Sequence, residues 1–357
     1  MKNKKIGLLV IAVVLLFGGT HAQVRKFSNE FLNIGVGANA LGQSNAVVAT
    51  VDDLSASYWN PAGLNSIGTQ TQIGVQHAEY FASIAKYDYF GFAKRIDPTS
   101  AIGISLIRFG VDDILDTSEL LDNQGNVDYD RINKFNAADY ALLLSYARNN
   151  IVKDLDLGVT TKLIYRNIGD FASAVGFGFD LGAQYQLKDW RFGAVVKDVT
   201  GTFNAWQVNT ERLSAVFDST GNEAPTEGLE LTLPSLVTGV SRAFSLSENL
   251  RLKGEFNFRT YFDGERNEIL SLGFASVDPS LGFQLGYKSW AFLRFGFGNF
   301  QKDRSFEGDK IGFQPNAGVG VVYNNFYLDY AFTDIGDQSV ALYSHVFSLK
   351  YQLALSK

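Results

Sequence analysis

The chain has 357 residues, with 37 acidic against 31 basic side chains and a formal net charge of −6. This acidic balance argues against nucleic acid as a partner. Without a cysteine, the chain can form neither a disulfide framework nor a lipid anchor on a cysteine. The 29 Phe, 16 Tyr and 35 Gly with only 6 Pro are typical of a large β-protein with aromatic girdles, not of a soluble α/β enzyme.

Residues 1–22 have the pattern of a cleaved signal peptide. Three lysines precede an apolar run over residues 6–17, and the run is followed by T-H-A, which ends in a small residue suited to cleavage. The run is shorter than the roughly 20 apolar residues of a transmembrane helix, and no comparable run follows it. An export signal without a later apolar run excludes a helical membrane bundle.

Removal of this leader would take away Lys2, Lys4 and Lys5 and leave 28 basic against 37 acidic residues, a net charge of −9. Two histidines would remain, His77 and His345, far apart in the sequence. We therefore expect no metal site and no cofactor.

Residues 23–68 do not alternate and predict a compact plug. The first part is rich in Gly and Ala, which allow close packing; the G-x-G-x-x-A of residues 35–40 lacks the βαβ context of a nucleotide site. Asp52 or Asp53 can cap a short helix, and Asn60 before Pro61 should be extended and end it. The hatch motif D-D-x-S-x-x-Y-W-N-P-A-G comprises Asp52, Asp53, Ser55, Tyr58, Trp59, Asn60, Pro61 and Gly63.

Residues 69–357 alternate as the wall of a membrane barrel must. Over residues 250–261, Leu, Leu, Gly, Phe, Phe and Thr on one face oppose Arg, Lys, Glu, Asn, Arg and Tyr on the other. We expect an all-β fold, a transmembrane antiparallel β-barrel of about 14 strands with an N-terminal plug. The strands expected are 69–81, 86–96, 99–110, 136–149, 154–168, 171–187, 189–199, 234–246, 248–262, 268–288, 290–300, 312–324, 325–335 and 341–355. The tenth is overlong and should hold a bulge or break near Asp278-Pro279.

The connections between these strands alternate in length. Those after even-numbered strands are brief, whereas the long connections 111–135, 200–233 and 301–311 all follow odd-numbered strands. Barrels have short periplasmic turns and longer external loops, so we expect the long ones outside the cell. The candidate partner-binding loop 200–233 carries Phe203, Trp206, Phe217 and Leu229. These side chains either dock a partner or pack the loop onto the rim.

The lumen and the loops show no catalytic pattern. There is no G-x-S-x-G, and neither later histidine has a Ser–acid pattern nearby, so we do not expect an enzyme. Residues 122–130 have the composition of a calcium loop without its spacing, which favours a solvated external loop. The charges expected in the lumen either line an ion path or pair with one another and with the plug. They are Asp156, Lys162, Arg166, Arg251, Lys253, Glu255 and Arg259.

The hatch motif carries a family resemblance. Residues 31–64 resemble the N-terminal hatch of the FadL-like outer-membrane barrels, and more closely the PorV/PorQ family, which serves the type IX secretion system of Bacteroidetes. Residues 285–287 (L-G-Y) and 292–297 (F-L-R-F-G-F) are similar to the family's G-x-E-Y … A-L-R-x-G-Y hairpin, with Gln284 near the usual Glu and Phe297 in place of Tyr. The match covers the hatch well, the last five strands moderately and the middle only by strand count.

The resemblance implies a non-enzymatic protein of the cell outer membrane. It implies as partners secreted cargo proteins with C-terminal sorting domains, proteins of the translocon or attachment complex, and outer-membrane lipids. The alternative is a FadL-like carrier for hydrophobic molecules, and a third possibility is a purely structural role in the envelope. Fold alone does not separate these functions.

Overall fold

The computed structural model describes residues 23–24, 28–68, 71–120, 124–213, 217, 228–305, 308–333 and 343–353. The expected leader over residues 1–22 lies outside these ranges. Within them, no helix is long and apolar enough to cross a membrane.

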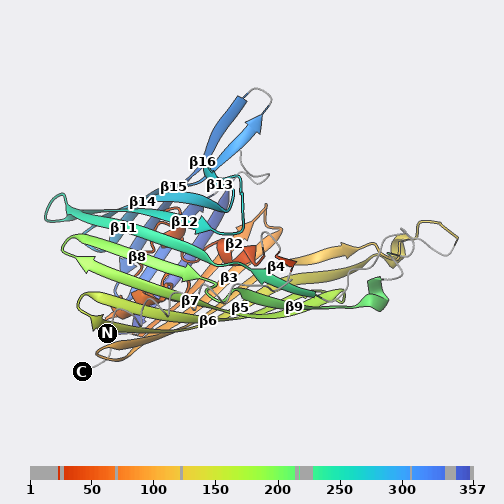
Figure 1. Ribbon diagram of the computed structural model, residues 1–357, viewed down its shortest axis with the longest axis horizontal. Helices are drawn as coiled ribbons and strands as arrows, with labels where there is room; N and C mark the ends of the chain where they lie inside the picture. Colours follow the sequence, from red (N-terminus) through yellow and green to blue (C-terminus); the bar gives the residue numbers. More distant parts are fainter. Residues whose placement is uncertain are drawn as a thin grey trace.

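The wall of the molecule is a closed antiparallel barrel, as the alternating sequence predicts (Figure 1). Its fourteen strands in the described part of the chain are β2 (Thr71–Tyr80), β3 (Ala85–Asp97), β4 (Ser100–Asp116), β5 (Asn133–Val152), β6 (Leu155–Ile168), β7 (Ala172–Leu187), β8 (Trp190–Lys197), β11 (Ser235–Ser245), β12 (Leu250–Tyr261), β14 (Ala275–Tyr287), β15 (Ala291–Ser305), β16 (Gly308–Tyr323), β17 (Phe326–Thr333) and β18 (Ser344–Leu353). The last strand closes on the first, from His345↔Glu79 to Leu353↔Thr71. Four further strands are β1 (Gln23–Val24), β9 (Thr202–Val208), β10 (Gly228–Thr232) and β13 (Leu270–Leu272).

Strand β12 shows how the alternation places side chains. Glu255 and Asn257 point into the barrel and are 1% and 3% exposed, whereas Phe258 on the opposite face is 38% exposed. The rings of Phe256 and Phe258 share that outer face, with centroids 4.4 Å apart. The expected facing of this strand is confirmed.

The lipid-facing position of Phe256 gives a stability prediction. Phe256 lies halfway along β12, so arginine there should lower the free energy of unfolding in lipid vesicles by about 2–4 kcal/mol, because a charge near the bilayer midplane is costly. The matched control is Leu246→Arg in the exposed turn after β11, with an expected loss of about 0–1 kcal/mol. If urea titration showed equal stability for the two variants, Phe256 would not face the apolar band.

Several connections are more strand-like than the sequence indicates. β4 and β5 extend into the connection 111–135, and the connection 200–233 contains β9 and β10. Figure 1 shows the β4–β5 and β15–β16 hairpins projecting from the barrel on the side away from the short turns.

The overlong tenth strand is divided, as expected, but the position near Asp278-Pro279 is wrong. The chain instead turns at Gly273 and Phe274, between β13 and β14, while Pro279 lies inside β14 opposite Phe258. β14 pairs with β15 only from Leu281↔Phe297 onward, so Pro279 lies where that side of β14 has no partner strand. Proline is tolerated at such an edge because its missing N–H removes no ladder bond.

One hairpin of the wall is interrupted by an irregular segment. β8 ends at Lys197, and after residues 198–201 the chain resumes as β9, which pairs with the outer half of β7. The returning strand is interrupted at the same level, between β10 and β11, at Leu233-Pro234. A long hairpin is thus divided into two halves. β8 and β11 form the half nearer the short turns, and β9 and β10 form the half farther from them.

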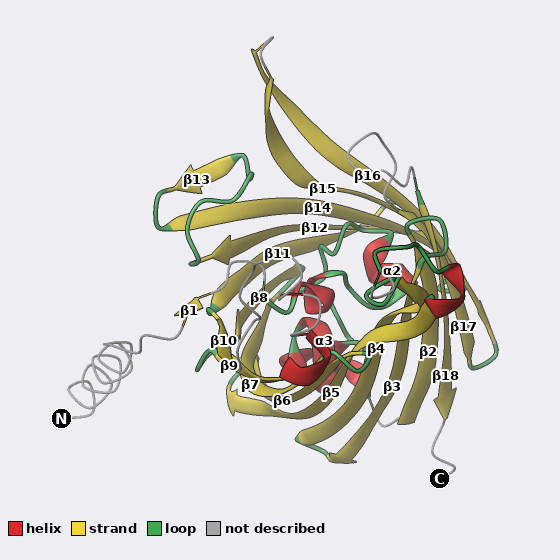
Figure 2. Cartoon of the chain, turned by 90° about the vertical axis from the view of Figure 1, so that its right-hand side faces the viewer, coloured by secondary structure: helices red, strands yellow, loops and turns green. Residues whose placement is uncertain are grey.

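The barrel interior is filled by the N-terminal segment (Figure 2). Four short helices, η1 (Glu30–Asn33), α2 (Ala38–Leu41), α3 (Ala56–Trp59) and η2 (Pro61–Ile67), lie inside the wall. Two inward-facing glycines allow a close approach: a Cβ at Gly158 would meet the backbone at Pro61, and one at Gly182 would meet the Asn60 amide. The plug and the wall therefore share one packed interior.

Candidate functional site: the plug and the outer cavity

Asp53 ties the plug to the last barrel strand. Its carboxylate accepts hydrogen bonds from the Ser55 N–H at 2.9 Å and the Ser55 hydroxyl at 2.6 Å, and it lies 2.7 Å from the Lys350 Nζ on β18. Burial alone would raise the pKa of Asp53, but the Lys350 ammonium and the Ser55 donors outweigh burial and lower that pKa below its usual value. Asp53 is thus held as a carboxylate.

Asp52 is placed differently from its neighbour. It is exposed and lines two cavities on the short-turn side of the plug, together with Lys253. Among the described residues, Asp53 accepts the N–H of Ser55, the residue just before α3, whereas Asp52 accepts no backbone N–H there.

Glu255 is a second tie between plug and wall. Its carboxylate, 1% exposed, accepts the Ala49 N–H at 2.7 Å and the Thr50 hydroxyl. Alternation places this residue in the lumen, but nothing in the sequence indicates which plug residues it meets, because they lie about 200 positions earlier. Bonds from neutral donors to a buried carboxylate are among the stronger ones in proteins.

The aromatic pair of the hatch motif braces the plug internally. Trp59 Nε1 donates to the Val36 carbonyl at 2.8 Å, and the Tyr58 hydroxyl donates to the Leu32 carbonyl at 2.5 Å. The two rings meet edge to face, with centroids 4.7 Å apart. Each buried polar tip therefore has a partner, as an aromatic side chain requires in a packed interior.

Asn60 joins the plug to the wall directly. It is extended, as expected before Pro61, and fully buried. Its Nδ2 donates to the carbonyls of Val48 and Ala183, at 2.9 and 3.0 Å, and its Oδ1 accepts the Ala62 N–H. Gly63 lies against the Val51 carbonyl, where a Cβ would not fit.

Of the charges expected in the lumen, Lys162, Arg166 and Glu255 are held by acids of the wall or by the plug. Lys162 lies 2.7 Å from Asp180 and also contacts Asp198, while Arg166 donates to both carboxylate oxygens of Asp139. This pattern favours structural pairing over a charged ion path.

The four aromatic and apolar residues proposed for the partner-binding loop do not form one patch. Phe203 on β9 faces outward near Phe177, with ring centroids 6.2 Å apart, and Leu229 on β10 is 48% exposed. Trp206 turns inward, where its Nε1 donates to Glu230 at 2.6 Å and the Arg166 guanidinium lies over its ring. Phe217 is half-buried.

Arg212 links the two long connections, which sequence reasoning treated as separate. One guanidinium nitrogen lies 2.7 Å from Asp116 at the end of β4, and another contacts Glu119. Phe171 lies beneath the same guanidinium. The β4–β5 hairpin, β9, β10 and residues 209–213 therefore form one continuous surface, which we call the outer rim.

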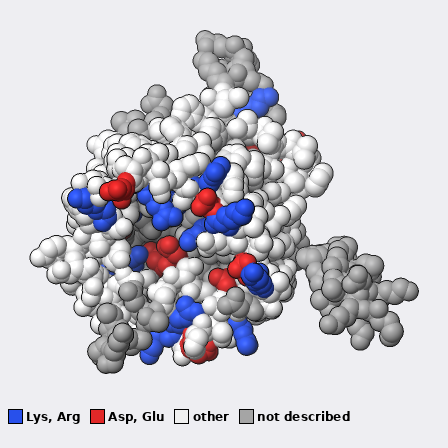
Figure 3. Space-filling model, turned by 90° about the vertical axis from the view of Figure 1, so that its left-hand side faces the viewer, with Lys and Arg blue, Asp and Glu red and all other residues white. Residues whose placement is uncertain are grey.

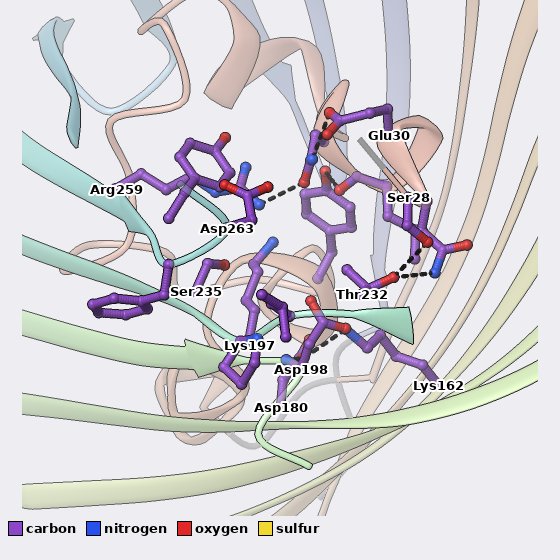
Figure 4. A pocket seen from close by; sticks show the side chains of 18 of the residues that line it. Ser28, Glu30, Lys162, Asp180, Lys197, Asp198, Thr232, Ser235, Arg259 and Asp263 are labelled. Atoms are coloured by element: carbon purple, nitrogen blue, oxygen red, sulfur yellow. Dashed lines mark hydrogen bonds and ion pairs between the residues drawn. The ribbon is translucent and has the colours of Figure 1, made fainter. Parts of the chain in front are cut away.

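The plug separates cavities at the two ends of the barrel. On the short-turn side, a cavity of about 530 Å³ is lined by charged residues such as Arg191, Arg251 and Lys253, and this face is visibly hollowed between acidic and basic side chains (Figure 3). On the other side, an outer cavity of about 420 Å³ lies between the plug and the outer ends of the strands, lined by Trp59, Lys197 and Arg259 among others. A smaller pocket beside it shares Lys197 and Arg259, and Figure 4 shows the Lys197 side chain extending into it.

A closed fourteen-stranded barrel with a compact N-terminal plug and lipid-facing apolar rows defines the class of plugged outer-membrane barrels. A family model described as type IX secretion system protein PorV matches residues 20–224, more than half of the chain. The chain belongs to the PorV family of type IX secretion proteins, a family of secretion barrels located in the outer membrane.

Solved structures share this fold at low sequence identity. The toluene transporter TodX of Pseudomonas putida has a TM-score of 0.55 at 11% identity, covering 90% of this chain and 99% of its own. The CymD monoaromatic hydrocarbon channel has a TM-score of 0.53 at 13% identity, covering 91% and 98%. The Ralstonia pickettii toluene transporter TbuX has a TM-score of 0.51 at 14% identity, covering 90% and 99%. No curated protein sequence matches the chain.

Proposed function

We propose that this barrel is a carrier of type IX secretion that binds the C-terminal signal domains of exported proteins at its outer rim. The observation that carries the proposal is the family membership, which the matched segment from plug to β9–β10 connection establishes. The barrel would receive cargo from the translocon and pass it to the attachment complex, with its apolar belt in outer-membrane lipid.

The outer rim has the features that such a surface needs. It lies at the strand ends away from the short turns, and the β4–β5 hairpin stands clear of the barrel (Figure 1). Leu229, Leu115 and Tyr129 on it are 48%, 59% and 73% exposed, among charged residues. Exposed apolar and aromatic side chains with a polar surround are typical of protein-binding surfaces.

Cysteine labelling on intact cells tests this proposal. The chain has no cysteine, so Glu119→Cys on the outer rim and Ser247→Cys in a short turn each give one labelling site. A membrane-impermeant maleimide should label position 119 and not 247, and a purified signal domain added beforehand should protect position 119, because it covers the rim.

Labelling of position 247 in intact cells would show that the barrel has the opposite orientation in the membrane. Full labelling of position 119 in the presence of saturating signal domain would show that the outer rim is not the binding surface. Co-purification of exported proteins from the native membrane gives an independent check.

The second candidate function is transport of a hydrophobic molecule. The outer cavity places Ile34, Leu41 and Val48 of the plug beside the wall, and the structural neighbours include proteins named as toluene transporters and a hydrocarbon channel. Native mass spectrometry that found a bound lipid or aromatic molecule, with no exported protein co-purifying, would favour this function over the first.

A further inference from the structure

The outer cavity contains a buried lysine amine without an anionic partner. Lys197, at the end of β8, is 7% exposed and lines both outer pockets. Its Nζ lies 4.4 Å from the centroid of the Tyr58 ring and 5.8 Å from that of Trp59, and it has no hydrogen bond or ion pair with any residue that the structure describes. An amine buried in this way is costly to charge unless an anion joins it.

The acids that act on Lys197, Asp180 and Asp198, do not serve as that anion, and Asp278 of the same cavity interacts with Arg259. Asp180 and Asp198 both contact Lys162, and Asp198 also accepts a hydrogen bond from Thr202. The ammonium of Lys197 extends away from this group into the pocket (Figure 4).

Arg259 supplies a second donor to the same cavity. One of its terminal nitrogens donates to the Asn33 side chain, but its Nε is buried with no acceptor in the described part of the chain. A guanidinium edge next to an ammonium suits a planar carboxylate, because arginine can donate to it in a fixed fork.

The cavity also contains acceptors that lack donors. The Oδ1 atoms of Asn45, Asn257 and Asp278 are buried without hydrogen bonds to described residues, and all three residues line the cavity. Such atoms need an N–H or O–H donor, which either water or a ligand can supply. A fatty acid offers a carboxylate but no such donor, whereas the end of a peptide chain offers a carboxylate and neighbouring amide N–H groups.

We propose that the outer cavity binds the C-terminal carboxylate of a peptide chain, held by Lys197 and Arg259, with the last amide N–H groups directed at the unpaired oxygens. This inference rests on the proposed function and specifies it further: the outer rim holds the signal domain, and the cavity takes its chain end. A volume of about 420 Å³ suits the last few residues of an extended chain and excludes a folded domain.

Binding of a signal domain with and without its terminal charge tests this inference. The full-length barrel in lipid nanodiscs is titrated with the signal domain of an exported protein, prepared either as the free acid or as the C-terminal amide. The amide should bind about tenfold more weakly, since it loses the charge-assisted bonds. Lys197→Met should weaken binding of the free acid by a similar factor, so that the free acid and the amide bind equally. Lys197→Arg should retain part of the difference between them.

The matched control is Lys253→Met, which replaces a lumenal lysine on the other side of the plug. This variant should bind the free acid more tightly than the amide, as the wild type does. Heat-modifiable migration on gels verifies that each variant is folded. Equal affinity of acid and amide for the wild type would overturn this inference and leave the proposed function standing. Failure of both forms to bind would defeat the proposed function itself. Lys197-dependent binding of sodium laurate, tighter than that of the peptide acid, would assign the cavity to a fatty carboxylate and overturn the peptide assignment.

Discussion

Cells carrying Trp59→Ala with Asn60→Ala are expected to become permeable to large antibiotics while export of type IX cargo continues. Replacing the buried indole should cost about 3–5 kcal/mol, because it removes a large apolar contact inside the plug. Loss of the Asn60 amide removes two further hydrogen bonds, to the Val48 and Ala183 carbonyls, worth about 0.5–1.5 kcal/mol each. The plug then loosens while the wall, with its own hydrogen-bond ladder, stays closed.

The measurements are the growth-inhibitory concentration of a large glycopeptide antibiotic and the amount of cargo exported. Trp190→Ala with Asn249→Ala is a matched control: it changes the same residue types at exposed positions outside the plug and should leave the barrier intact. Loss of export in a folded, non-leaky hatch variant would contradict a purely sealing plug and would support a plug that moves during transport.

Lys350→Met is expected to destabilise the plugged state by about 3–5 kcal/mol, because it leaves the buried Asp53 carboxylate without its cation. Adding Asp53→Asn should recover most of this loss, since an uncharged pair needs no counter-charge. Urea titration in lipid vesicles of the wild type, the two single variants and the double variant gives the coupling energy.

The same pair predicts a pH dependence. The pKa of Asp53 is lowered in the folded state, so its contribution to stability is complete above the unfolded value of about 3.9 and declines as the pH falls below it. The stability difference between wild type and the Asp53→Asn/Lys350→Met variant should therefore shrink from pH 7 to pH 3. A difference independent of pH over this range would show that the ion pair does not hold the plug.

The sequence reveals the barrel because each wall strand has one apolar and one polar face. That constraint repeats every two residues, so it remains visible without any knowledge of the partners of a strand. The strands around Phe256 and Phe258 are found for this reason. Extensions such as the outer part of β4, beyond residue 110, are missed because a strand standing clear of the lipid no longer needs an apolar face.

The contacts of the plug are less accessible to sequence reasoning. The hatch motif identifies Asp53 and Asn60, but their partners Lys350 and Ala183 lie 297 and 123 positions away. Which wall residue meets which plug residue depends on strand register and barrel tilt, and one sequence does not encode these in a local pattern. The interruption between β8 and β9 is easier to find in the sequence than the plug contacts are. Gly201 and Pro234 lie at the same level of the hairpin, and each interrupts one of its two strands.

The seam between the first and last wall strands has a consequence for biogenesis. β2 and β18 pair with each other, and β18 also touches the plug, where the Ser348 hydroxyl accepts the Ala38 N–H at 3.1 Å. The plug is synthesised before any wall strand, yet the strand that completes its enclosure is made after all the others. The small-residue surface of the plug therefore stays without its complete wall until residues 344–353 pair with β2. Enclosure of the plug and closure of the barrel thus depend on the same strand pairing, between β2 and β18.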